Sequence, residues 1–244
     1  DDTTGTINNG TAITSASSST GKNYGIYSTG TVWNTGDIKF TNGTGNVGIF
    51  AMNGANITNS GAITLGASTT TDRSIGIVAN AGIVSNSGDI KVNGDYGLGL
   101  YSDKNGTSSG IINNSGAITV NGNETIGAYA SSDSNINLTG GNVTTNGDQS
   151  TGYYLSNGNS STIGSAATIS VTGNEANGVF VNGPSGNLTY NGNTTVAGDA
   201  AYGLIVDGNS NVNATGGTLT VKGTSGINGT SSAANTSRGS AALV

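Results

Sequence analysis

The segment Asn59-Ser-Gly-Ala-Ile63-Thr-Leu65 is one of four closely similar segments in this chain of 244 residues. In each of them Asn, a small residue and Gly form a polar turn, after which two apolar residues flank one polar residue. Because successive side chains of a strand point to opposite faces, this alternation predicts a short strand with one apolar face. The other three segments are Asn34-Thr-Gly-Asp-Ile38-Lys-Phe40, Asn86-Ser-Gly-Asp-Ile90-Lys-Val92 and Asn114-Ser-Gly-Ala-Ile118-Thr-Val120.

A second kind of segment, in which Gly is followed by an apolar, an aromatic and a small residue, precedes these strands. It occurs eight times at intervals of 23 to 28 residues, and another apolar stretch separates it from each Asn-rich turn. Each repeat of about 25 residues therefore holds three predicted strands. Looser third strands follow at residues 139–143, 168–171 and 215–221, and a half repeat stands at residues 5–13. The repeat glycines are Gly25, Gly48, Gly76, Gly99, Gly127, Gly152, Gly178 and Gly203.

Stacking is the way such units fold, because one unit cannot bury its apolar face alone whereas stacked copies share a continuous core. Three strands in about 25 residues predict an all-β fold, a parallel β-helix (β-solenoid) of about eight three-strand rungs. A β-propeller blade needs about 40 residues and four strands, and the Leu-x-x-Leu-x-Leu signature of a leucine-rich repeat is absent. Gly and Asn suit corners with positive φ, and stacked Asn side chains are expected to hydrogen-bond in ladders.

The repeats divide the chain into three parts. Residues 1–24 are expected to form an N-terminal rung, and residues 25–223 the body of eight repeats. In residues 224–244 the pattern decays into Gly, Ser, Thr and Ala, which predicts a degenerate rung or a linker tail. Because a truncated solenoid exposes its terminal rung, we expect the parent protein to continue with further turns or a cap.

The composition restricts the chemistry that the chain can perform. It contains 43 Gly, no Cys and no His, so no thiolate nucleophile, imidazole base or Cys/His zinc site is expected. Only 8% of the residues are charged and the net charge is −6, so we expect no nucleic acid among the partners. No apolar stretch approaches the about 18 residues of a membrane span, and no membrane insertion of this segment is expected. We also expect no cofactor and no metal.

The repeated Asn-Ser-Gly-[Ala/Asp]-Ile-[Thr/Lys]-[Val/Leu] and Gly-Ile-[Tyr/Phe]-Ala-type segments resemble the passenger domains of autotransporters, the type V secretion proteins of Gram-negative bacteria. The likeness covers about residues 5–223 and is greatest to the very large autotransporter adhesins of oral anaerobes. It implies a right-handed parallel β-helix at the bacterial cell surface, anchored in the outer membrane through a part of the protein outside this chain. Two-partner-secretion adhesins, S-layer proteins and phage fibre proteins carry similar repeats and stay open as alternatives.

A mostly aromatic column stands two residues after the repeat glycines, and it holds six of the thirteen aromatic residues. The residue before it in each repeat is mostly aliphatic, and strand alternation sends the two columns to opposite faces. If the aliphatic column is core, the aromatic column faces outward and suits stacking on sugar rings or packing against a partner rod. The alternatives are an aromatic stack inside the solenoid and an outward column covered by a loop. The column reads Tyr27, Phe50, Val78, Tyr101, Tyr129, Tyr154, Phe180 and Ile205.

Two insertions are further candidates for binding. Residues 66–73 lengthen the connection before one repeat and end in Asp72 and Arg73. Residues 103–110, which begin with Asp103 and Lys104, lengthen the corner after another first strand. Insertions in a solenoid often carry binding because a rigid rod positions them, although neutral drift explains their composition equally well.

Paired carboxylates on a β-helix would suit polysaccharide cleavage, and Asp37 and Asp89 occupy equivalent positions two rungs apart. That separation, roughly 10 Å, slightly exceeds the range for inverting glycosidases. Solvated corner carboxylates are therefore the preferred interpretation, and no catalytic residue is predicted.

The sequence thus predicts a non-enzymatic adhesin segment, a rigid stalk whose side face and loops bind a glycan or protein receptor on another cell. Lateral self-association of the rods is a second kind of partnership that the aromatic column would permit. The alternatives are a pure spacer, fibre or S-layer element and, less favoured, a polysaccharide-degrading enzyme.

Overall fold

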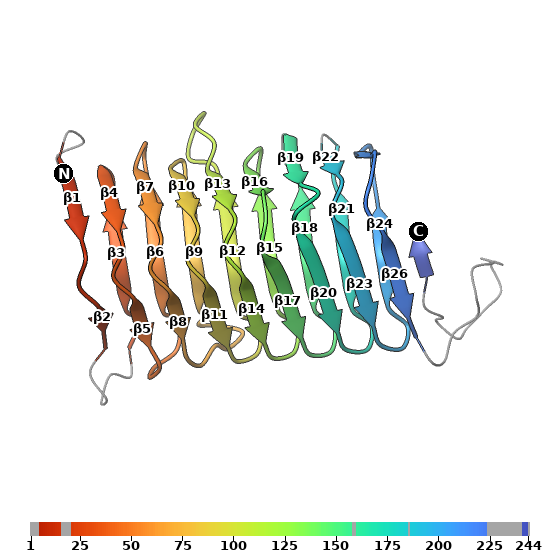
Figure 1. Ribbon diagram of the computed structural model, residues 1–244, viewed down its shortest axis with the longest axis horizontal. Helices are drawn as coiled ribbons and strands as arrows, with labels where there is room; N and C mark the ends of the chain where they lie inside the picture. The colour runs from red at the N-terminus through yellow and green to blue at the C-terminus, as the bar shows by residue number, and fades with distance from the viewer. Residues whose placement is uncertain (1–4, 16–20, 158–159, 185, 224–240, 244) are drawn as a thin grey trace.

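The computed structural model describes residues 5–15, 21–157, 160–184, 186–223 and 241–243. These residues form stacked coils made only of strands and turns, with every strand parallel to its neighbours (Figure 1). Three nine-stranded sheets run along the rod, here called sheets A, B and C, and the chain visits them in the same order in each turn. The predicted all-β parallel β-helix is confirmed, and strands β3 to β26 make eight full turns.

Each sheet collects the same strand of every turn. Sheet A contains β1 (Thr6–Asn9), β4 (Thr31–Asn34), β7 (Asn56–Asn59), β10 (Ile83–Asn86), β13 (Ile111–Asn114), β16 (Asn135–Leu138), β19 (Ser160–Ile163), β22 (Asn187–Tyr190) and β25 (Asn211–Ala214). Sheet B contains β2 (Ile13–Thr14), β5 (Ile38–Phe40), β8 (Ile63–Leu65), β11 (Ile90–Asn93), β14 (Ile118–Asn121), β17 (Asn142–Asn146), β20 (Thr168–Thr172), β23 (Asn193–Ala197) and β26 (Leu219–Lys222). Sheet C contains β3 (Tyr24–Ser28), β6 (Val47–Met52), β9 (Ile75–Asn80), β12 (Leu98–Asp103), β15 (Ile126–Ser131), β18 (Thr151–Ser156), β21 (Asn177–Asn182), β24 (Tyr202–Val206) and β27 (Ala241–Leu243).

The two ends of the chain add partial turns to the eight full ones. In the segment expected to form an N-terminal rung, β1 and β2 begin sheets A and B. Most of residues 224–244, expected to be a degenerate rung or linker tail, lies outside the described residues. Its described part, β27, pairs with β24 in sheet C.

The core is built from columns of side chains that occupy the same place in successive turns. In sheet B, Ile63 and Leu65 point inward and are buried, while Thr64 between them is partly exposed. Pairing in register sets Ile90 beside Ile63 and Val92 beside Leu65. The repeat therefore excludes water from the same apolar positions in turn after turn, and this burial is the main contribution to stability.

The repeat glycines lie inside the strands of sheet C, and their role there is steric. A Cβ atom on Gly48 would lie 2.5 Å from the carbonyl oxygen of Gly76 and 2.6 Å from Cγ2 of Ile63. No side chain has room between the neighbouring strand and the side chains of sheet B. The expectation that glycine serves the corners is confirmed for other glycines, such as Gly94 with φ 101° and Gly122 with φ 134°.

Four successive strands of sheet A end in buried asparagines, which are Asn34, Asn59, Asn86 and Asn114. The Nδ2 of each of the first three donates to Oδ1 of the next at 2.6–2.7 Å. All four also donate to the carbonyl oxygen two residues further along the chain at 2.8 Å. The expected asparagine ladder is confirmed, and it ends where Leu138 takes the equivalent position in β16.

Candidate functional site

The aromatic column lies on the outer face of sheet C. Its inward neighbours, the aliphatic column, are buried throughout, with Ile49, Ile77 and Leu100 fully enclosed. Tyr27 is 58% exposed, and the other aromatic members of the column are partly exposed. This arrangement excludes the alternative in which the aromatic rings stack inside the solenoid.

One member of the inner column is itself aromatic. Tyr153 is fully buried beside Ala128, whose small side chain leaves room for the ring in the neighbouring strand. The hydroxyl of Tyr153 donates to the backbone carbonyl of Ile136 at 2.8 Å. This bond satisfies the one polar atom that the ring carries into the core, and burial raises the pKa of the phenol.

The outward rings form two stacks separated by one rung. Tyr27 and Phe50 stack with ring centroids 5.3 Å apart, and Tyr24, at the start of β3, packs edge-on against both. The second stack has centroid separations of 5.4, 4.8 and 5.0 Å and runs through Tyr101, Tyr129, Tyr154 and Phe180. Offset or parallel contacts of this kind stabilise a pair of rings by about 0.5–1.5 kcal/mol beyond the area that they bury.

Val78 occupies the rung between the two stacks. It pairs with Phe50 on one side and Tyr101 on the other, and it is only 3% exposed. A hollow of about 230 Å³ lies over this interruption. Val47, Ile75 and Val78 contribute its apolar part, and Tyr24, Phe50, Tyr101, Lys22 and Arg73 are among its other lining residues.

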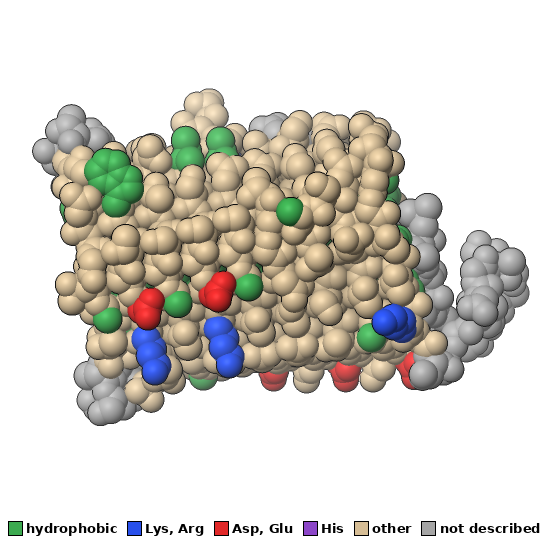
Figure 2. Space-filling view, in the orientation of Figure 1, with side chains coloured by type: hydrophobic (Ala, Val, Ile, Leu, Met, Phe, Trp, Pro, Cys, Tyr) green, Lys and Arg blue, Asp and Glu red, His purple; other side chains and the backbone are tan. Residues whose placement is uncertain are grey.

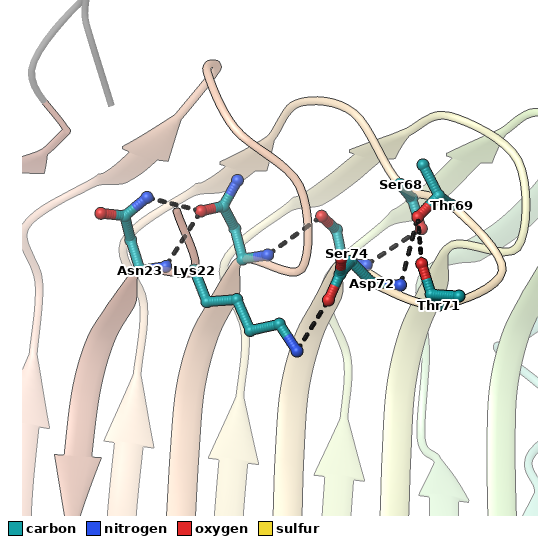
Figure 3. A network of polar contacts seen from close by, with 8 residues as sticks. Lys22, Asn23, Ser68, Thr69, Thr71, Asp72 and Ser74 are labelled. Atoms are coloured by element: carbon teal, nitrogen blue, oxygen red, sulfur yellow. Dashed lines mark hydrogen bonds and ion pairs between the residues drawn. The ribbon is translucent and has the colours of Figure 1, made fainter. Parts of the chain in front are cut away.

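The 66–73 insertion is tied by an ion pair to the corner before β3, two rungs earlier, as Figure 3 shows. The carboxylate of Asp72 forms an ion pair with Lys22 at 2.7 Å, and the amide of Asp72 donates to Oγ1 of Thr69. Ser74 closes the insertion through Oγ, which donates to the carbonyl of Ala67 at 2.7 Å. These contacts hold the insertion against the rod and bring Arg73 to the hollow.

Arg73 differs from Lys22 in its electrostatic surroundings. In the part of the chain that the structure describes, no carboxylate lies within ion-pair distance of its guanidinium. Its Cζ lies 5.9 Å from the centre of the Tyr96 ring, within the range of a cation–π contact. The hollow is therefore lined by one cation paired with Asp72 and one cation that rests on an aromatic ring.

The 103–110 insertion follows the C-terminal end of β12, whereas the 66–73 insertion precedes the N-terminal end of β9. The 103–110 insertion extends beyond the neighbouring loops (Figure 1). The hydroxyl of Tyr101 donates to Oδ2 of Asp103 at 2.9 Å, and Lys104 forms an ion pair with Asp133. Asn105 and Ser108 exchange backbone hydrogen bonds at 3.0 and 3.2 Å and close the tip. Of the two insertions, only the 66–73 segment contributes a residue to the hollow.

The carboxylates considered for catalysis bind backbone amides. Oδ1 of Asp37 accepts the amide of Ala62 at 2.9 Å, and Oδ1 of Asp89 accepts the amide of Ala117 at 3.1 Å. Within the described ranges, no group of three or more acidic residues is placed to hold a metal ion. Both aspartates thus bridge one rung to the next, which accounts for their recurrence in the repeat.

At the corner between sheets B and C, a longer column of side chains also accepts backbone hydrogen bonds from the next rung. Side-chain oxygens of four members accept the backbone N–H of the next member at 2.8–3.0 Å. Asp alternates with Asn, so that like charges in the column stand two rungs apart. The column consists of Asp95, Asn123, Asp148, Asn174 and Asp199. The residues that follow include Glu124 and Glu175, with φ 54° and 55°, so the expectation that Gly and Asn take the positive-φ corners holds only in part.

Alkaline pH is expected to weaken the rod through Tyr101. Burial, and then its hydrogen bond to the Asp103 carboxylate, raise the pKa of Tyr101 from 10.0 to about 12. Since the folded-state pKa is the higher one, the neutral phenol contributes stability that is present below pH 10 and is lost as the pH rises towards 12. In urea unfolding followed by circular dichroism, Tyr101→Phe should lose less stability over this interval than the wild-type chain. Equal losses in both proteins would contradict the assignment.

The fold and its outer face define the chain as a parallel β-solenoid with a column of aromatic rings along one sheet. The sequence matches no protein-family model and no curated protein, and the structure matches no solved structure. In the described residues, no helix has the length and hydropathy needed to cross a membrane. A view of one face of the rod shows mostly neutral polar side chains, with few charged groups (Figure 2).

Several residues that line the hollow, among them Lys22 and Tyr24, were not predicted from the sequence. Lys22 and Tyr24 come before the first repeat glycine, where the repeat gives no expectation for them. One signal was present in the sequence, since Val78 interrupts an aromatic column that resumes at Tyr101. A gap in a column of large side chains marks a place where the surface can be indented.

Proposed function

We propose that the chain is an adhesive rod segment that binds a saccharide through the outer face of sheet C. The observation that carries the proposal is the outward aromatic column on a surface otherwise made mostly of small polar residues. Aromatic rings offer large apolar area at little conformational cost, and exposed apolar patches in soluble proteins commonly mark interaction sites. A sheet of parallel strands in register is a rigid support for such a face.

The cell-surface setting is part of the same proposal. It is supported by the resemblance of the repeats to autotransporter passenger domains, which implies a stalk displayed outside a Gram-negative cell. A rod of stacked rungs suits this role, because it holds a binding face at a distance from its anchor without needing a large globular core.

A structural spacer is the second candidate, and the ring stacking itself favours it. Tyr129, Tyr154 and Phe180 cover one another's faces at centroid distances of 4.8 and 5.0 Å. Such a stack stabilises sheet C whether or not a ligand is present.

Replacing Tyr101, Tyr129 and Tyr154 by Ser separates the two functions. We expect binding to a glycan array to fall at least tenfold, since the variant removes most of the second stack while leaving the inward columns intact. Trp33→Ser is the matched control, because Trp33 is 48% exposed but belongs to sheet A. Circular dichroism would establish that both variants are folded. Undiminished glycan binding by the folded triple variant would favour the spacer.

A further inference from the structure

We propose that the hollow over Val78 binds the carboxylate-bearing ring of an acidic saccharide, with Arg73 as the cation that recognises the carboxylate. This inference rests on the proposed function, for which it names the ligand class and the position on the rod. The hollow contains both groups that such a ligand requires, because aromatic and apolar side chains border it and a guanidinium lies at its edge.

The shape of the site follows from the interruption of the aromatic column. Phe50 and Tyr101 belong to strands on either side of β9, so one rung separates their rings. At about 4.8 Å per strand, they are displaced by roughly 10 Å along the rod, which is twice the spacing of stacked neighbours. Among the described residues, no ring contact joins them. The hollow of about 230 Å³ falls below the roughly 300 Å³ at which sites for drug-sized ligands begin, so it suits one sugar ring of a longer chain.

The charge beside the hollow differs from the charge further along the same corner of the rod, the corner between sheets B and C. Lys22 and Arg73 stand at the corner between sheets B and C in the early rungs, and later rungs carry Asp95, Glu124 and Asp148 there. A carboxylated ligand would be repelled along the later rungs and attracted only at the hollow. The chain as a whole has a net charge of −6, so this local positive charge is against its general trend.

Arg73 is the cation that remains for a ligand. The ion pair with Asp72 occupies Lys22 at 2.7 Å, whereas the guanidinium of Arg73 lies over the Tyr96 ring. A cation–π contact uses the face of the guanidinium and leaves its N–H edge available, and that edge matches the two oxygens of a carboxylate. One such cation suits a ligand with one carboxylate, while a polyphosphate would need several.

The test compares acidic saccharides with counterparts in which the carboxylate has been reduced to the alcohol. Oligosaccharides ending in glucuronic, galacturonic or sialic acid are offered to the whole chain on an array, and the best pair is then titrated by calorimetry. We expect at least a tenfold preference for the acidic member. Arg73→Gln should reduce this preference to less than twofold, and Val78→Tyr, which places a ring in the gap, should reduce binding of the acidic member at least tenfold.

Lys39→Gln provides the matched control for Arg73→Gln. It removes the same charge from an exposed position on sheet B, and it should retain the preference. Unfolding curves for each variant would separate a lost site from a lost fold.

The outcomes distinguish this inference from the function on which it rests. If the wild-type chain binds neither acidic nor neutral saccharides, the proposed function fails and the inference fails with it. If it binds both equally, or if Arg73→Gln keeps the preference, the inference is overturned while saccharide binding stands. If a polyglutamate peptide binds as tightly as the acidic saccharide and Arg73→Gln abolishes its binding, the hollow is a site for acidic protein segments. The assignment of a saccharide ligand to the hollow would then be overturned.

Discussion

Gly99→Ala should destabilise the rod by about 3 kcal/mol or more, at the upper end of what overpacking a core usually costs. The added Cβ would lie 2.4 Å from the carbonyl oxygen of Gly127 and 2.5 Å from Cγ2 of Ile118. One contact is with the backbone of the next strand, so relief requires β12 and β15 to separate rather than one side chain to rotate. Urea unfolding followed by circular dichroism would measure the loss.

Hydrogen exchange would locate the damage. Because each rung of a solenoid contacts mainly its neighbours, protection should fall first in β12 and β15 and less in distant rungs. Gly140→Ala is the control, since its Cβ would have no neighbour nearer than 3.8 Å and its backbone does not need a positive φ. We expect it to change stability by less than about 0.5 kcal/mol. Similar losses in the two variants would contradict a steric role for the repeat glycine.

The fold could be predicted because it repeats. Ile63 and Leu65 are buried for the same reason as Ile90 and Val92, because they occupy the same positions of the repeat. The four copies of this segment therefore predict where the strand lies, which of its faces is buried and how it pairs with the strands of neighbouring turns. The asparagine ladder was predictable on the same grounds, since equal residues at equal positions must meet when rungs stack. The outward direction of the aromatic column then followed once the aliphatic column was core.

The candidate site depends on contacts that the repeat does not contain. Asp72 pairs with Lys22 fifty residues earlier, a contact between an insertion and the chain before the first repeat glycine. The sequence places Asp72 and Arg73 side by side in a polar loop. It does not indicate which of the two forms an ion pair within the chain and which stays available to a ligand. Glu124 shows the same limit at a corner, because neighbouring rungs hold its backbone at φ 54°, against its local preference.

Asn59→Ala should cost about 3 kcal/mol through the loss of three buried hydrogen bonds, at about 1 kcal/mol each. Asn59 accepts from Asn34 at 2.6 Å and donates to Asn86 at 2.6 Å and to the Gly61 carbonyl at 2.8 Å. The variant leaves Asn34 without one acceptor and Asn86 without one donor, in a place that water does not reach. Urea unfolding followed by circular dichroism would measure the change.

A double-mutant cycle tests whether the bonds act as a ladder. Asn59→Ala and Asn86→Ala each remove the bond between the two side chains, so the double variant should cost about 1 kcal/mol less than the sum of the single ones. Asn59→Ala and Asn114→Ala share no bond, and their effects should add to within about 0.5 kcal/mol. Additive effects in both cycles would mean that each asparagine stabilises its own turn only, through its bond to the carbonyl two residues on.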